Sequence, residues 1–355
     1  MTNNKNDKIF ISGLESVRGI SACLIVYFHV WALCGFAGGS VVLDSIVSNF
    51  DSSVRMFFLL SGFALLCGYE KSLFSSEVSL KNFYIKRFFK IAPVFYLVVI
   101  IQVLISYFFQ NHLYSITSII MSATLLFGFL PVNQELIVWA SWAVGIECIF
   151  YLVFPLFVLI AKNKYYLIVS LILSLIITYN YSSLIGNGIP NSHMNILIYL
   201  SYFFMGGVLY RIIPLISKIK KGKAWNIIEI PFLITSLMLG ILITKLFSRD
   251  IGMLIAFSLI ICGAIYGYSC IIENKITRFL GSISYPMYLL HMIVVQVLSK
   301  FGVIQAISRC ISNVYIRYVV VGTLVVLFTC ILAHFVTRYV ERYWVEKGKR
   351  YLKRI

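Results

Sequence analysis

The sequence predicts an all-α polytopic membrane protein with about ten transmembrane helices, one re-entrant segment and no soluble domain. Of the 355 residues, 60% are hydrophobic and 12% are charged, which is half the charged fraction of a typical soluble domain. The chain also divides into apolar runs of about 20 residues, the length that a helix needs to cross a bilayer. Its basic residues gather in short clusters between these runs, as membrane topology predicts.

The net charge of +17 raises nucleic-acid binding as an alternative. Because the charge lies between apolar runs, membrane topology explains it better, and we expect no nucleic-acid partner. The eight cysteines form no CxxC pair, so we interpret them as packing residues rather than a disulfide framework. No metal-ligand spacing such as HExxH connects the histidines, and we predict no metal site.

The polar stretches between the apolar runs are too short to form a soluble domain. We therefore expect a single transmembrane domain over residues 1–355, with an N-terminal tail at 1–13 and a C-terminal tail at 338–355. The apolar segment 116–139 is interrupted by Pro131, Asn133, Gln134 and Glu135, and we expect it to enter the membrane and return. The ten predicted spans cover residues 14–34, 54–70, 91–110, 142–161, 165–181, 195–213, 229–247, 251–271, 283–300 and 318–337.

The distribution of Lys and Arg predicts the orientation. If the N-terminus is cytoplasmic and 116–139 returns to its own side, 24 of the 30 Lys and Arg fall in cytoplasmic segments, in agreement with the positive-inside rule. If 116–139 crossed fully, the basic loop near Lys218 and the tail from Arg338 would face outward. We therefore expect both termini to be cytoplasmic.

Two ionisable residues lie in the first span. Arg18 and His29 are eleven residues apart, which on a helix is three turns plus about 20°, so both lie on one face about 16 Å apart. Ionisable residues within spans are costly, and they usually face a bundle interior or a water-filled cavity. The alternative is that Arg18 is a topology anchor and His29 a hydrogen-bonded packing residue.

Further charges lie at two other helices. Lys86, Arg87 and Lys90 precede the third span, and Arg87 and Lys90 are neighbours on one helical face, where they could hold phosphates; the alternative is an ordinary positive-inside anchor. Glu147 is buried in an apolar helix five residues after Trp142. A carboxylate there needs a partner, and its expected depth is close to that of His29, so the two could meet.

The last two spans carry a third set of polar residues. Tyr285, Tyr288 and His291 could line a cavity that suits a hydroxylated substrate, although a packed histidine explains them equally well. Near the end of the last span, Glu341 stands between Arg338 and Arg342, which we interpret as a salt-bridged cap.

Six short phrases together resemble the integral-membrane acyltransferase 3 family, whose members O-acylate surface glycans and other envelope acceptors. The first matches the family pattern directly at Arg18 and His29, two others are similar to it, and three depart from it. In the Trp-to-Glu phrase the usual residues after Glu147 are replaced by Cys148 and Ile149. In the basic phrase the second arginine is replaced by Lys90, which loses bidentate phosphate geometry. In the terminal phrase the customary proline is Tyr343. The phrases are SVRGISACLIVYFH, RMFFLLSGFAL, FYIKRFFKIAP, SWAVGIECIFYLVFPL, GSISYPMYLLH and YVERYW.

The resemblance implies an acyl-CoA-dependent O-acyltransferase in a bacterial inner (cytoplasmic) membrane. Acetyl-CoA would be the donor, and a polysaccharide such as O-antigen or capsule, or its lipid-linked precursor, would be the acceptor. His29 would act as general base or carry the acyl group briefly, with Glu147 and Arg18 as the other catalytic candidates. The donor-binding candidates are Arg87, Lys90 and Lys86, and the acceptor-binding candidates are Trp142, Tyr285, Tyr288 and His291.

Two other functional classes fit parts of the sequence. A proton-coupled transporter or flippase of a lipid-linked glycan would use His29 and Glu147 as a proton relay; consumption of acyl-CoA distinguishes it from an enzyme. A scaffold for an envelope-synthesis complex would make no use of His29.

Overall fold

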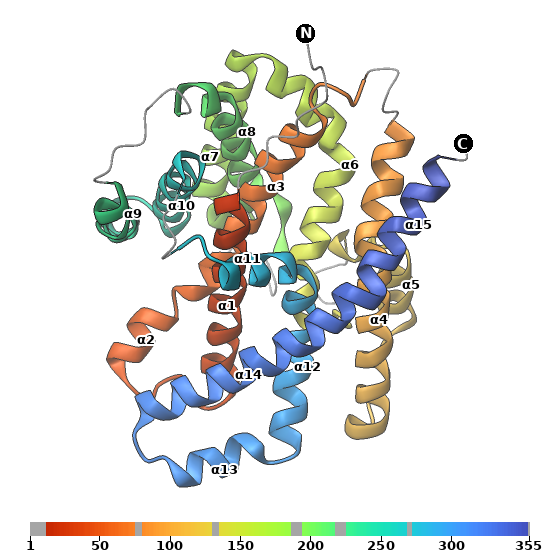
Figure 1. Ribbon diagram of the computed structural model, residues 1–355, viewed down its shortest axis with the longest axis vertical. Helices are drawn as coiled ribbons and strands as arrows, with labels where there is room; N and C mark the ends of the chain where they lie inside the picture. Colours follow the sequence, from red (N-terminus) through yellow and green to blue (C-terminus); the bar gives the residue numbers. More distant parts are fainter. Residues whose placement is uncertain are drawn as a thin grey trace. The chain divides into compact units, whose positions relative to one another are not determined.

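The computed structural model of the protein describes residues 12–74, 80–129, 135–185, 194–216, 225–267 and 272–353. These residues form helices joined by short connections, and no strand occurs among them (Figure 1). The predicted all-α class is confirmed. The basic loop around Lys218 and the first eleven residues lie outside the described ranges.

Within the described residues, nine segments are long and apolar enough to cross a membrane. A tenth arises if α11 and α12, which meet at a 76° bend, form one broken span. All ten predicted spans coincide with these segments. Their principal helices are α1 (Ser12–Leu33), α3 (Ser53–Tyr69), α4 (Leu80–Gln110), α6 (Trp142–Lys162), α7 (Lys164–Ile185), α8 (Ile196–Ile216), α9 (Trp225–Leu246), α10 (Arg249–Tyr266), α11 (Lys275–Ser282), α12 (Ser284–Lys300) and α14 (Val314–Val336).

Two helices extend well beyond their predicted spans. Helix α4 begins at Leu80 rather than at residue 91, because residues 80–90 are interrupted by charged side chains but contain no Gly or Pro that would end the helix. Helix α14 continues through a π-helical segment, Thr337–Glu341, into α15 (Arg342–Leu352), as Figure 1 shows. The predicted C-terminal tail is therefore largely helical. Shorter helices cover Val41–Val47 (α2), Ile116–Ala123 (α5) and Val303–Cys310 (α13).

The chain forms two compact units. The first comprises residues 1–18, 55–83 and 150–279, and the second comprises residues 19–54, 84–149 and 280–355. We describe each unit by itself. That residues 1–355 act as one acyltransferase-like domain stays a prediction.

In the first unit, α3 and α8 run parallel. Phe58 in α3 packs against Tyr199 near the start of α8, with ring centroids 4.8 Å apart. One turn further along α3, Gly62 lies against the backbone of Phe203. Just after α3 ends, Glu70 accepts a 2.7 Å hydrogen bond from Tyr210. In these three contacts the residue numbers increase along α3 and along α8 together. The two helices therefore run in the same direction.

This shared direction requires an odd number of membrane crossings between α3 and α8. Helices α4, α6 and α7 supply three crossings, and a full crossing by residues 116–139 would add a fourth and reverse α8. In the described part of that segment, α5 has only eight residues, or about 12 Å of helix, which is too short to span. This agrees with a return of 116–139 to its starting side, which stays a prediction because residues 130–134 lie outside the described ranges.

In the second unit, α1 and α14 run antiparallel. The Tyr27 hydroxyl is 2.8 Å from Thr323 Oγ1, whereas the Tyr318 hydroxyl donates to the Tyr27 carbonyl at 3.0 Å. Further along, the hydroxyls of Ser40 and Tyr315 are 2.8 Å apart. Within this unit the contacts therefore run in opposite order along the two helices.

Helix α4 joins the other elements of the second unit. The Tyr96 hydroxyl donates to the Ala123 carbonyl of α5 at 2.6 Å, and Gln102 of α4 bonds to Gln296 of α12 at 3.2 Å. Near its start, Phe89 packs against Gly348 of α15, where an added Cβ would lie 2.8 Å from the Phe89 ring. The absence of a side chain at Gly348 thus allows α15 to lie directly against α4.

Candidate active site

His29 lies on α1, four residues before the helix ends, and is 7% exposed. Its Nδ1 is 2.9 Å from the carbonyl oxygen of Ile25, one turn back on the same helix. The same Nδ1 is 3.0 Å from Nε2 of His291 on α12. Two histidines that are 262 residues apart in sequence therefore meet in the interior of the second unit.

His291 is fully buried, at 0% exposure. Its Nδ1 is 2.6 Å from the carbonyl oxygen of Tyr288, three residues back on α12. The two rings are tilted by 44° with centroids 4.8 Å apart, so they meet through ring nitrogens rather than by stacking. His291 is therefore a buried residue in direct contact with the predicted general base, His29.

Aromatic side chains enclose the His29 ring. Trp139 meets it edge-on with centroids 5.4 Å apart, and Phe28 lies at 5.1 Å. Trp139 is in a short 3-10 turn, Trp139–Ser141, that packs against α12. Because Trp139 is 50% exposed, the histidine pair lies beside a side chain that reaches the molecular surface.

Glu147 and Trp142 lie on α6, which follows the Trp139 turn. Both are partly buried and both take part in interactions of their own. His29 contacts Ile25, His291 and the neighbouring aromatic rings. The contact of its Nδ1 with His291 orients the imidazole, and a role for Glu147 stays a prediction.

Arg18 shares α1 with His29, and the unbroken helix from Ser12 to Leu33 confirms that both belong to one span. Arg18 is exposed whereas His29 is buried. Arg18 belongs to the first unit and His29 to the second, so we describe the site without it.

The two predicted acceptor-binding tyrosines mainly make contacts within the protein. The Tyr285 hydroxyl donates to the Ile91 carbonyl of α4 at 2.9 Å, which connects α12 to α4. Tyr288 is 7% exposed, and its ring centroid is 5.8 Å from that of His291. Both residues thus support the helix that carries His291.

The three predicted phosphate-binding residues lie on the first turns of α4, with Lys86 exposed and Arg87 half-buried. Lys90 forms an ion pair with Glu341, which is buried while Arg338 and Arg342 are exposed. The predicted pairing of Glu341 with those arginines is therefore wrong. The neighbours of Glu341 in sequence point outward along the helix, and the buried carboxylate faces α4.

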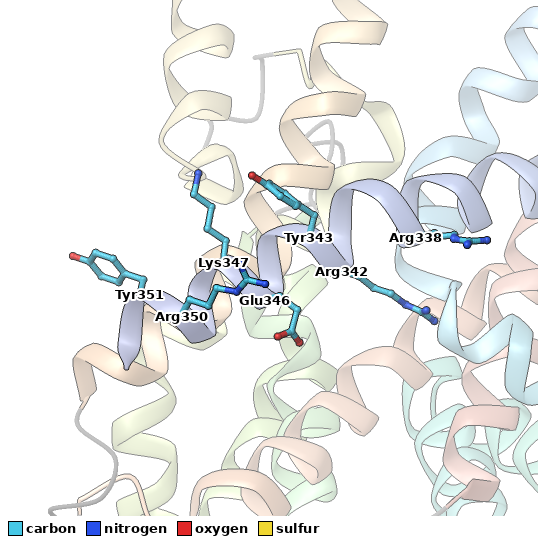
Figure 2. A pocket seen from close by; sticks show the side chains of 7 residues that line it. All are labelled: Arg338, Arg342, Tyr343, Glu346, Lys347, Arg350 and Tyr351. Carbon is cyan, nitrogen blue, oxygen red and sulfur yellow. The ribbon is translucent and has the colours of Figure 1, made fainter. Parts of the chain in front are cut away.

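A basic groove runs along α15, with a volume of about 560 Å³ (Figure 2). Two ridges of side chains form it, each with residues four apart on the helix. Tyr343 and Lys347 project to one side and Arg342 and Glu346 to the other, as Figure 2 shows. The groove holds four basic side chains and one acidic one, and its lining is Arg338, Arg342, Tyr343, Glu346, Lys347, Arg350 and Tyr351.

Comparison with known proteins decides the family. A family model described as an acyltransferase domain matches residues 11–335, which include the histidine pair and α4. This chain belongs to the acyltransferase 3 family. A relative from Acidianus two-tailed virus, provisionally named acetyltransferase ORF330, is 25% identical over 309 residues, covering 83% of this chain and 86% of the relative. No solved structure matches the chain.

Sequence reasoning missed two features of this acyltransferase. Trp139 stands three residues before the predicted Trp142, and its ring contacts His29. On sequence alone, the basic residues of α15 are interpreted as a cytoplasmic cluster, and no groove is predicted there. Its signal was the four-residue spacing of Arg338, Arg342, Glu346 and Arg350, which places side chains on one helical face.

Proposed function

We propose that this protein is a membrane O-acyltransferase that moves an acetyl group from acetyl-CoA to a hydroxyl of a cell-surface polysaccharide or of its lipid-linked precursor. Family membership supports acyl transfer. The observation that carries the assignment of the site is the buried contact between His29 and His291 within transmembrane helices. Histidine is the side chain that most often serves as a general base in enzymes.

His29 is the proposed general base. It removes the proton from the acceptor hydroxyl as the oxygen attacks the thioester carbonyl; a C–O bond forms, and the C–S bond breaks. The proton then passes from His29 to the departing sulfur, so that the products are the O-acetylated glycan and free CoA with its thiol. In the alternative route His29 itself attacks the thioester carbonyl, so that a C–N bond forms as the C–S bond breaks and the thiolate takes up a proton. The acceptor oxygen then attacks this acyl-imidazole, and a C–O bond forms as the C–N bond breaks.

The donor phosphates would bind at the start of α4 and on the adjacent α15. Arg87 and Lys86 supply charge from α4, whereas Lys90 shares its charge with Glu341. Because α15 lies against α4 at Gly348 and Phe89, its basic groove adds cations to the same part of the second unit. A guanidinium offers two parallel hydrogen bonds to a phosphate, which favours Arg87 as the principal contact. Arg18 remains a further candidate on α1.

The acceptor would bind beside Trp139 and His29, with Trp142 and Glu147 on the following helix. An aromatic ring that reaches the surface can pack against a sugar ring while the buried imidazole meets one hydroxyl. In this proposal Tyr285, Tyr288 and His291 contribute by supporting His29 rather than by touching the acceptor.

Acetyl transfer can be tested in vesicles that contain the purified protein, acetyl-CoA with a labelled acetyl group and a polysaccharide acceptor. We expect label in the polysaccharide and release of free CoA thiol in equal amounts. In mass spectra, the surface glycans of cells with the gene should be heavier by one acetyl group than those of cells without it. A transporter would move a lipid-linked glycan without consuming acetyl-CoA, and that result would overturn the proposal.

Arg87→Ala should raise the KM for acetyl-CoA by about tenfold or more, because a charge-assisted hydrogen bond contributes on the order of 1.5–3 kcal/mol. Arg87→Lys should raise it less, because lysine keeps the charge and loses the fork geometry. The measurement is the initial rate against acetyl-CoA concentration. The control is Arg309→Ala, which removes the same charge from an exposed position on α13. Equal changes in KM for the two variants would mean that Arg87 serves only as a topology anchor and does not bind acetyl-CoA.

We further propose that the protein lies in a bacterial inner membrane with both termini cytoplasmic, which brings the start of α4 to the acetyl-CoA pool. Single cysteines at positions 183 and 222, in a chain without its eight native cysteines, test this orientation. An impermeant thiol reagent on intact cells should label Ser183→Cys and spare Gly222→Cys, and both should react after permeabilisation. The reverse pattern on intact cells would contradict the proposed orientation.

A further inference from the structure

We propose that His291 is a positioning residue that fixes the hydrogen of His29 on Nδ1 and so makes Nε2 of His29 the atom that takes the proton. This inference rests on the proposed function, since it says which atom of His29 reacts. It assigns His291 to a role in the site other than the acceptor binding expected from sequence.

The assignment begins at Tyr288. Its carbonyl oxygen lies 2.6 Å from Nδ1 of His291, and a carbonyl can only accept a hydrogen bond. Nδ1 of His291 therefore carries a hydrogen. In a neutral imidazole only one nitrogen carries a hydrogen, so Nε2 of His291 has a free lone pair.

The second step is the contact between the two rings. Nε2 of His291, now an acceptor, is 3.0 Å from Nδ1 of His29. The carbonyl of Ile25, also an acceptor, is 2.9 Å from the same Nδ1. Both partners require a hydrogen on Nδ1 of His29. The opposite tautomer would place its lone pair against two acceptors, with no hydrogen for either.

Nε2 of His29 is then left with a lone pair. The hydrogen bond from His29 to His291 also stabilises the protonated form of His29. When Nε2 takes a proton from the acceptor, the resulting imidazolium still donates through Nδ1 to His291, and a charge-assisted bond is stronger than a neutral one. His291 is 0% exposed, so it acts through His29 and does not itself meet the acceptor.

Substitutions of His291 separate this role from packing. In His291→Gln the amide oxygen can occupy the place of Nε2 and accept from His29, whereas His291→Asn reaches only the place of Nδ1 and His291→Leu offers no acceptor. We expect kcat to fall at least about thirtyfold in the Leu and Asn variants and less than about fivefold in the Gln variant. The KM for acetyl-CoA should stay within about twofold in all three.

Nitrogen-15 NMR of histidine-labelled protein in detergent micelles gives a second readout, with His29→Ala to assign the signals. We expect a protonated Nδ1 and an unprotonated Nε2 for His29 in the unmodified protein. In His291→Leu only the Ile25 carbonyl still accepts from Nδ1, so we expect a smaller excess of this tautomer. A hydrogen on Nε2 in the unmodified protein would overturn the proposal. So would a folded Gln variant as inactive as the Leu variant. If the unmodified protein transferred no acetyl group, the proposed function would fail, and the NMR result would still decide the tautomer.

Discussion

His29→Ala is expected to abolish acetyl transfer while the protein still inserts and folds. Loss of a positioned general base costs on the order of a hundredfold to ten-thousandfold in rate, and loss of a nucleophile would cost no less. The side chain is small enough that its removal leaves α1 packed against α14 through Tyr27 and Tyr318. The measurement is the rate of labelled acetyl incorporation into polysaccharide, divided by the amount of folded protein.

The control for this experiment is a histidine outside the pair. His112→Ala removes an exposed imidazole of the second unit that bonds to Glu135 at 2.8 Å, and it should keep close to full activity. A His29→Ala variant that folds and retains most of its transfer rate would remove His29 from the mechanism and would favour a scaffold. Loss of activity in both variants would point to general destabilisation rather than to catalysis.

The fold was predictable because a membrane span is a local signal. About 20 apolar residues in succession are sufficient to identify a span, and each of the ten predicted spans has its counterpart among the described residues. The boundaries were less predictable. Hydropathy detects only the apolar part of a helix, and Lys86 and Arg87 belong to α4 although they stand outside its apolar run.

The partners within the site were beyond the reach of sequence reasoning. His29 and His291 were each identified as candidates, but their contact depends on how α1 packs against α12, which no local pattern encodes. For Glu341, sequence reasoning predicted the wrong partners. Its neighbours in sequence suggested Arg338 and Arg342, yet the tertiary packing of α15 against α4 gives it Lys90. Charges adjacent in sequence are weak predictors of ion pairs when a buried carboxylate faces another helix.

Gly62→Leu is expected to cause the largest loss of stability. In α3 an added Cβ at Gly62 would lie 2.3 Å from the carbonyl oxygen of Phe203 on α8, and a backbone atom of a packed helix cannot move aside cheaply. Small residues let membrane helices approach closely, and overpacking typically costs 1–3 kcal/mol, more when backbone must shift. We expect the midpoint of thermal unfolding in detergent to fall by roughly 10 °C, or the variant not to accumulate.

Gly68→Leu is the matched control on the same helix, because an added Cβ there meets no atom within 4 Å. It should unfold at or slightly above the midpoint of the unmodified protein, since leucine is the better helix former. The comparison also tests the topology. The parallel pairing of α3 with α8 is the observation that favours a return of residues 116–139 to their starting side. If Gly62→Leu and Gly68→Leu unfolded at the same temperature, the close approach of α3 and α8 would be absent, and that count of membrane crossings would lose its basis.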